Sequence, residues 1–68
     1  MRKKLKKARQ NHSLTQKQVA EILGILPTSY QKIEYGERTG SVKIWDKLED
    51  LFSISQKELR ENEGGNKD

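Results

Sequence analysis

The six residues 27–32 (Pro-Thr-Ser-Tyr-Gln-Lys) carry the side chains with the most evident recognition chemistry in this sequence. Gln31 has an amide donor and an amide acceptor and can pair bidentately with adenine, whereas Lys32 can donate to O6 and N7 of guanine. The methyl group of Thr28 can contact a thymine methyl group. If the segment is helical, these three side chains point away from the side that carries Tyr30. A solvated helix has a similar polar face, so both interpretations stay open on this pattern alone.

Basic side chains are concentrated in the first half of the chain. Residues 1–35 contain eight Lys/Arg and two Glu, a net charge of +6, whereas residues 36–68 contain six Lys/Arg and eight Asp/Glu, a net charge of −2. A basic face is typical of proteins that contact a polyanion, although a solvated charged surface gives the same count. One cluster is interpreted either as a DNA-facing arm or as a solvated helix face: Arg2, Lys3, Lys4, Lys6 and Lys7.

The residue types that catalysis needs are scarce. The chain has no cysteine, which excludes disulfides and thiolate zinc sites, and its single histidine, His12, cannot form a metal cluster alone. Glu34 and Glu37 flank a turn, where we expect them to be solvated or paired with Arg38. Because no phosphate-binding Gly-rich loop or paired carboxylates can be recognised, the sequence predicts no enzyme activity, no cofactor and no metal.

Caps and apolar spacing predict five helical segments. They cover about residues 2–11, the stretch between Thr15 and Gly24, residues 27–34, residues 42–52, and a short segment opened by Ser55. Thr15-Gln16-Lys17-Gln18 reads as a capping box, and Ser55-Gln56-Lys57-Glu58 reads as a second one. Pro27 is favoured at a first helical position, and Gly24 and Gly36 are typical helix ends. The sequence therefore predicts an all-α fold.

An apolar stripe in residues 42–52 predicts the core. At roughly 100° per residue, one arc of this helix holds Ile44, Trp45, Leu48, Leu51 and Phe52. We therefore interpret Trp45 as a core residue and not as a binding aromatic. Ile44 and Leu51 lie at one flank of the arc, where they are either the edge of the core or a contact with a partner chain.

Two short helices joined by a tight turn, with Ala20 in the first and Gly24 in the turn, are typical of a helix-turn-helix. The small Ala20 allows the two helices to cross closely, and Gly24 tolerates a positive φ. In the third predicted helix, Tyr30 and Ile33 would face back onto the preceding helix.

From about Leu5 to Leu59 the chain resembles the Cro/repressor-type (XRE) family of regulators. The resemblance is carried by Leu14-Thr15-Gln16, Val19-Ala20, Leu23-Gly24-Ile25, Ile33-Glu34-Tyr35-Gly36-Glu37-Arg38, Ser41-Val42, Leu48, Phe52-Ser53-Ile54-Ser55 and Leu59. It implies a compact five-helix bundle of the lambda-repressor-like type, with a helix-turn-helix formed by helices 2 and 3. The chain departs from the family at Leu26, where Ser or Thr is usual, and at Tyr35, where Asn is usual.

The resemblance also implies the contacts with DNA. The residues expected to contact bases are Pro27, Thr28, Ser29, Gln31 and Lys32. The residues expected to contact phosphates are Arg9, Gln16, Tyr35, Arg38 and Lys43. For Tyr35 the alternative is packing against the fourth helix.

These expectations together predict a sequence-specific, duplex-DNA-binding transcription regulator, a repressor that reads the major groove with residues 27–34. A homodimer on a two-fold operator is the expected assembly. The alternative is a protein-interaction module of the same fold, such as an antitoxin or an antirepressor. The absence of acidic side chains at Thr28, Gln31 and Lys32 favours DNA.

The remaining expectations concern the chain as a whole. Residues 1–62 are predicted to form the domain, and the Gly-rich residues 63–68 a disordered tail. The basic start Met1–Lys7 is not followed by an apolar stretch, so neither a signal peptide nor a membrane span is expected. A cytoplasmic location is the expectation, with no small-molecule ligand.

Overall fold

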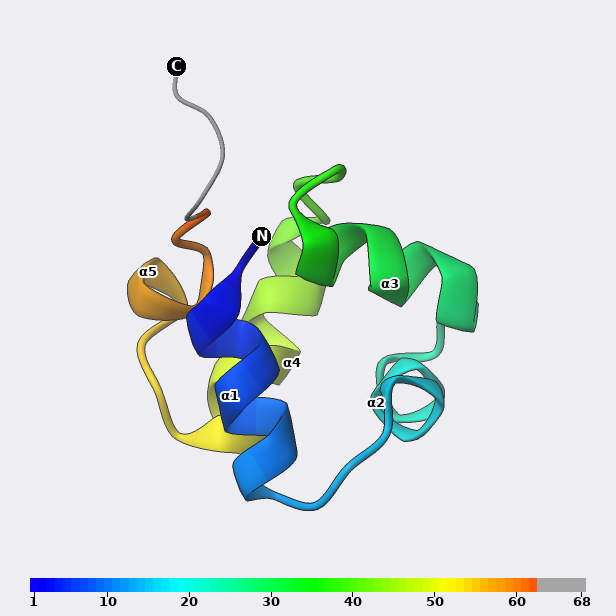
Figure 1. Cartoon of the computed structure of the whole chain (residues 1–68), viewed down its shortest axis with the longest axis horizontal. Coiled ribbons are helices and arrows are strands. Elements are labelled where there is room, and N and C mark those ends of the chain that lie inside the picture. The colour runs from blue at the N-terminus through cyan, green and yellow to red at the C-terminus, as the bar shows by residue number, and fades with distance from the viewer. Residues whose placement is uncertain (63–68) are drawn as a thin grey trace.

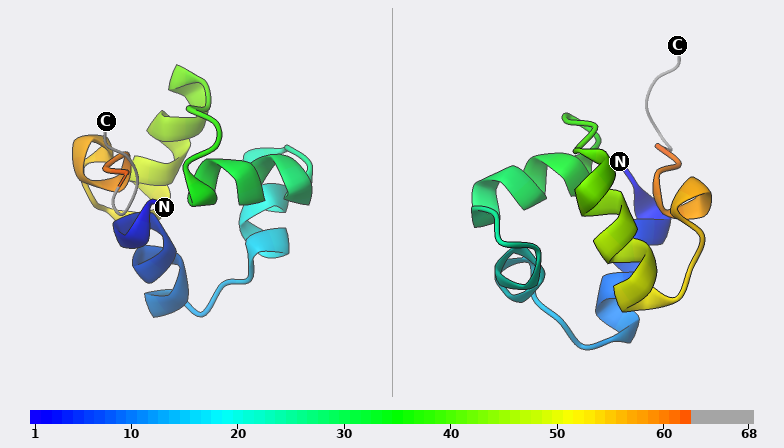
Figure 2. Two further views of the ribbon diagram at one scale, coloured as in Figure 1. Left: turned by 45° about the horizontal axis from the view of Figure 1, so that its top comes forward. Right: turned by 180° about the vertical axis from the view of Figure 1, so that it is seen from behind.

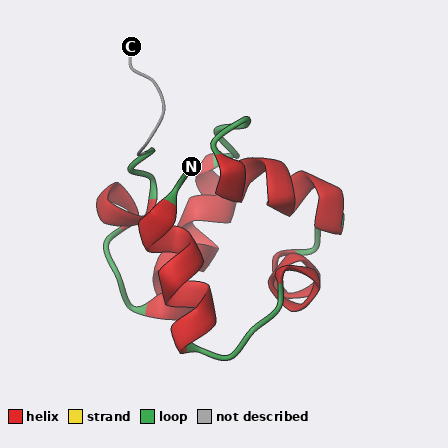
Figure 3. Ribbon diagram, viewed as in Figure 1, coloured by secondary structure: helices red, strands yellow, loops and turns green. Residues whose placement is uncertain are grey.

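The computed structural model describes residues 1–62, and short loops join its five helices (Figures 1 and 3). The helices are α1 (Lys3–Asn11), α2 (Gln16–Leu23), α3 (Pro27–Tyr35), α4 (Val42–Phe52) and α5 (Gln56–Leu59). No strand occurs within residues 1–62, and the predicted all-α class is confirmed. The tail expected at residues 63–68 lies outside the described residues.

The helix-turn-helix predicted for the second and third helices is present as α2 and α3, which pack against each other. In Figure 1, α2 is seen end-on while α3 lies across the view, so the two helices run in different directions. The other helices support the pair, because α1 contacts α3 and α5, and α4 contacts α2 and α5. Figure 2 shows α2 and the start of α3 at one side of the molecule, with α1, α4 and α5 at the other.

Local signals set the bounds of α2 and α3. The Thr15 side chain accepts from the Gln18 backbone N–H, and the Gln18 side chain accepts from the Thr15 N–H, which completes the predicted capping box. Gly24 ends α2 with φ +74° and Gly36 ends α3 with φ +86°, both in the left-handed region that favours glycine. The first of these glycines makes the turn that brings α3 across α2.

The second predicted capping box is not formed, although Ser55 caps the helix. The Ser55 hydroxyl caps the helix by accepting from the backbone N–H of Lys57, the second helical residue, whereas a capping box needs a bond from the third, Glu58. The carboxylate of Glu58 instead faces Lys4 of α1, with 4.0 Å between Oε2 and Nζ. Packing against α1 therefore gives Glu58 another partner.

One apolar core joins all five helices. Trp45 has 1% of its surface exposed, so its predicted place in the core is confirmed, as are those of Tyr30 and Ile33. Ile44 and Leu51 are half-buried at the edge of this cluster. The buried apolar side chains are Leu5, Ala8, Val19, Ala20, Leu23, Tyr30, Ile33, Trp45, Leu48, Phe52 and Leu59.

Arg2 corrects the interpretation of the basic start as either a DNA-facing arm or a solvated face. Its side chain is buried, and its guanidinium donates to the backbone carbonyls of Ile33, Arg38 and Arg60 at 2.6, 2.8 and 3.0 Å. It also lies 5.2 Å from the centre of the Trp45 ring. Burial lowers the pKa of Arg2, and the nearby charge of Arg60 lowers it further. Arg2 therefore ties the end of α3 to Arg60, the residue that follows α5.

Candidate nucleic-acid interface

The outward side of α3 brings most of the expected base-contact residues together. Four of them, Pro27, Thr28, Gln31 and Lys32, are exposed and form what we call the reading face, while Ser29 is half-buried beside it. This side carries no acidic residue. The opposite side of the helix is buried and holds Tyr30, Ile33 and Glu34. A helix anchored along one side presents the reading face in a fixed orientation.

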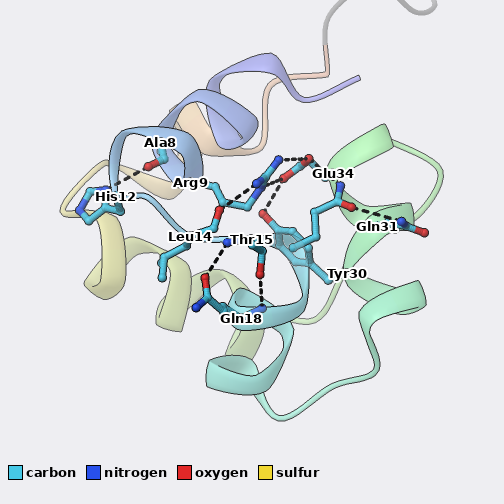
Figure 4. Close-up of polar contacts among 10 residues, drawn as sticks. Ala8, Arg9, His12, Leu14, Thr15, Gln18, Tyr30, Gln31 and Glu34 are labelled. Carbon is cyan, nitrogen blue, oxygen red and sulfur yellow. Dashed lines mark hydrogen bonds and ion pairs between the residues drawn. The ribbon is translucent and has the colours of Figure 1, made fainter.

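Glu34 is the largest departure from the sequence-based expectation. It was expected to be solvated or paired with Arg38, but its side chain is fully buried and bonded to a residue of α1. The guanidinium of Arg9 donates from Nε to Glu34 Oε2 at 2.8 Å and from Nη2 to Oε1 at 3.1 Å. Figure 4 shows Arg9 and Tyr30 converging on this carboxylate.

Two further side chains complete the surroundings of Glu34. The Tyr30 hydroxyl donates to Oε2 at 2.9 Å, and the Gln16 amide donates to Oε1 at 2.9 Å. A carboxylate has about four lone-pair sites, and here each oxygen accepts two bonds. We call Arg9, Gln16, Tyr30 and Glu34 the Glu34 network. It links α1, α2 and α3 through polar bonds at a place where the core would otherwise be apolar.

The electrostatics of the network favour an ionised Glu34. Burial raises the pKa of its carboxyl, but hydrogen bonds from Arg9, Gln16 and Tyr30 outweigh burial, so the pKa lies below its ordinary value of 4.5. Burial and the adjacent carboxylate raise the pKa of the Tyr30 phenol well above its ordinary value. The hydrogen bond to Glu34 raises the pKa of Arg9. The resting state therefore contains an anionic Glu34, a cationic Arg9 and a neutral Tyr30.

This charge state predicts a loss of stability in acid. Because the pKa of Glu34 is lower in the folded than in the unfolded chain, its contribution is complete above pH 4.5 and is lost as the pH falls through the lowered folded value. Urea unfolding at pH 7 and at intervals down to pH 2 measures the slope. In an Arg9→Met/Glu34→Gln variant this part of the slope should be missing. Equal slopes in the two proteins would contradict the assignment.

The expected phosphate-contact residues lie in two groups. Tyr35, Arg38 and Lys43 are exposed at the end of α3, in the loop that follows it and at the start of α4. Gln16 and Arg9 are half-buried and belong to the Glu34 network. These assignments stay predictions.

Arg9 has less freedom than a surface phosphate contact. Its side chain is 11% exposed, and besides the two bonds to Glu34 it donates from Nη1 to the Leu14 carbonyl at 2.9 Å. The guanidinium therefore holds the loop between α1 and α2 as well as α3. These bonds give Arg9 a structural role in the fold. A phosphate could reach only the small exposed part of its guanidinium.

The loop that carries Arg38 is held on both sides. The Trp45 indole N–H donates to the Thr39 carbonyl at 2.6 Å, next to the bond from Arg2 to the Arg38 carbonyl. The Arg38 backbone N–H donates to the Lys32 carbonyl at 3.2 Å. The backbone at Arg38 is therefore fixed relative to α3, although its side chain is exposed.

Sequence reasoning missed the Glu34 network, although one signal for it was present. A tyrosine at an inward position of a helix usually needs a hydrogen-bond partner for its hydroxyl, and Glu34 follows Tyr30 by one helical turn. Arg9 could not be added from spacing, because it lies on another helix 25 residues away in sequence.

Comparisons with known proteins agree with this geometry. A family model described as helix-turn-helix matches residues 5–59 of the chain. Searches of curated proteins and of solved structures gave no significant match. Among the described residues, no helix combines the length and the apolar character that crossing a bilayer requires. In the same part of the chain, no three His, Asp or Glu side chains gather as metal ligands would.

Proposed function

This chain belongs to the XRE (Cro/repressor-type) helix-turn-helix family of DNA-binding transcription regulators, and on that premise we propose that it recognises a specific base sequence through α3 and acts as a repressor. The observation that carries the proposal is the reading face. It is exposed and free of acidic residues, and it stands on a helix fixed from behind by Glu34, Tyr30 and Ile33. DNA-binding domains of this type place such a helix in the major groove.

The reading face supplies complementary chemistry for base edges. The Gln31 amide fits adenine, the Lys32 ammonium fits guanine, and the Thr28 methyl group fits thymine. Ser29 reaches the duplex from the edge of the face. Pro27 has neither an N–H nor a polar side chain, so its contact is with a sugar or a methyl group.

Phosphate contacts position the reading face on the duplex and supply most of the affinity. Gln16 lies at the start of α2, where it has backbone N–H groups around it, and its amide keeps one N–H after bonding Glu34. Arg38 and Lys43 flank the other end of α3, with Tyr35 between them and the reading face. Arg9 would reinforce the contact from its exposed edge.

Repression by occupying a promoter needs no further domain, because the bound protein excludes polymerase. Two copies on a two-fold operator would read half-sites about 10 bp apart. Ile44 and Leu51, half-buried at the edge of the core, are the surface that we propose for the partner chain. Such a protein works where the DNA is, in the cytoplasm.

Replacing Gln31 with alanine tests base recognition. Removing a bidentate contact should weaken binding to the preferred duplex by about 1–3 kcal/mol and relax the preference at one base pair. Titration of labelled duplexes that differ at single positions measures both effects. Equal weakening on all duplexes, including unrelated ones, would mean that Gln31 does not read a base.

Replacing Arg38 with alanine tests the phosphate contacts. The variant should bind every duplex more weakly and lower the slope of log K against log salt by about one unit, because one fewer counterion is released. The matched control is Arg60→Ala, since Arg60 is exposed and directly follows α5, the helix that packs against α1 and α4. An unchanged slope in the Arg38 variant would remove it from the interface.

A further inference from the structure

The side-chain bonds around Gln16 have a fixed direction. Oε1 of the buried Glu34 carboxylate can only accept, so the Gln16 amide must turn its nitrogen toward it, and the Nε2–Oε1 distance is 2.9 Å. The other three positions on the carboxylate are occupied by donors from Arg9 and Tyr30. Gln16 therefore has one orientation in which it satisfies Glu34, and its own oxygen points away from the carboxylate.

That orientation is passed on to the reading face. Gln16 Oε1 accepts from Gln31 Nε2 at 3.2 Å. If the Gln31 amide were reversed, its oxygen would face the oxygen of Gln16. The Gln16 amide cannot turn to avoid this without losing its hydrogen bond to Glu34. Figure 4 shows the dashed contact that ends on the Gln31 amide at the outward side of α3. Gln31 thus keeps its carbonyl oxygen and a single N–H for a ligand.

The remaining acceptor and donor of the Gln31 amide match the edge of adenine and do not match the edge of guanine. Adenine presents the N6 amino donor beside the N7 acceptor, whereas guanine presents two acceptors, O6 and N7. A freely rotating glutamine amide can offer either its oxygen or both of its N–H groups. We propose that Glu34, acting through Gln16, fixes the orientation of the Gln31 amide, so that Gln31 hydrogen-bonds well to adenine and discriminates against guanine.

Glu34 and Gln16 are in this account positioning residues that determine specificity, and the inference rests on the proposed function. Lys32 provides an internal contrast, because its ammonium carries three equivalent donors and has no orientation to fix. Specificity at the Lys32 base pair should therefore not depend on the Glu34 network.

The test compares two duplexes that differ only at the base pair whose preference Gln31→Ala removes. One carries adenine and the other guanine at the position read. The wild-type protein should prefer adenine by about tenfold or more. In Gln16→Met, the preference should fall to within about threefold, with discrimination at all other base pairs unchanged. Overall affinity also falls with the lost phosphate contact, but the ratio of the two affinities is insensitive to that loss. Glu21→Ala, the matched control at an exposed position of the same helix as Gln16, should keep the adenine preference.

Glu34→Gln should also lower the ratio of the affinities for the adenine and guanine duplexes, because an amide at position 34 can turn either its oxygen or its N–H groups toward Gln16. Should this variant fail to fold, Gln16→Met alone decides, since it leaves Arg9, Tyr30 and Glu34 bonded. A wild-type preference for guanine, or an adenine preference that survives in Gln16→Met, would overturn the inference and leave sequence-specific binding intact. A wild-type protein with no preference at any base pair would overturn the proposed function, and this inference with it.

Discussion

Arg9→Ala should lower the free energy of unfolding by about 3–5 kcal/mol, because it leaves the Glu34 carboxylate buried without its cation. Glu34 is fully buried, and Arg9 supplies two of its four donors. A domain of this size is expected to have a total stability of only about 3–9 kcal/mol, so a large part of the variant should be unfolded at 37 °C. Urea unfolding followed by circular dichroism at pH 7 measures the loss.

The control for Arg9→Ala removes both charges. In an Arg9→Met/Glu34→Gln variant no buried charge is left without a partner, so this double variant should be more stable than Arg9→Ala. Arg9→Lys keeps the charge but not the bidentate hydrogen bonding to Glu34, and its stability should lie between those of wild type and Arg9→Ala. If the free energy of unfolding of Arg9→Ala lies within about 1 kcal/mol of the wild-type value, the Arg9–Glu34 pair behaves as a surface ion pair, and Arg9 contributes little to the stability of the fold.

Trp45→Ala is expected to have an effect of similar size on stability, about 3–5 kcal/mol, because it empties a large volume in the core. The ring is 1% exposed and lies beside Arg2 and Arg60, with its N–H bonded to the Thr39 carbonyl. The loss should therefore also loosen the loop that carries Arg38. Thermal unfolding followed by circular dichroism measures the change in Tm.

Val42→Ala is the matched control on the same helix. Val42 is 74% exposed, so the substitution should change stability by no more than about 0.5 kcal/mol. Comparable losses in the two variants would mean that α4 is not packed as described. Since Trp45 is the only tryptophan of the chain, its fluorescence in the Val42 variant also reports on unfolding.

Most of the fold could be predicted from local signals. Each helix-end signal depends only on residues close together in the sequence, and each lies where it was expected: the capping box at Thr15, the proline at the start of α3, and the glycines after α2 and α3. Helix α4 spans residues 42–52 as predicted, because its apolar stripe and Ser41 cap agree. Periodicity within one helix needs no knowledge of the others, which is why Trp45 could be assigned to the core.

The rest depends on contacts between segments far apart in sequence. Arg2 belongs to a run of basic residues and differs from its neighbours because three backbone carbonyls meet at its guanidinium, one in α3, one in the following loop and one just after α5. Glu34 is buried because Arg9 of α1 reaches it. Charged residues are rarely buried, so composition argued against both placements. For the candidate site, the outward position of Thr28, Gln31 and Lys32 was predictable, while the bonds that orient Gln31 were not.

The central claim, that α3 reads a base sequence, is tested most directly by selecting bound duplexes from a random DNA pool at about 150 mM salt, a concentration that limits purely electrostatic binding. The wild-type protein and a Gln31→Ala/Lys32→Ala variant are compared in parallel, after circular dichroism has shown that both are folded. We expect the wild type to enrich a defined motif that the variant fails to enrich, and a palindromic motif if two copies bind together. Enrichment of the same motif by both proteins would place base recognition outside α3. Absence of enrichment with the wild type would contradict sequence-specific binding and favour a protein-interaction role.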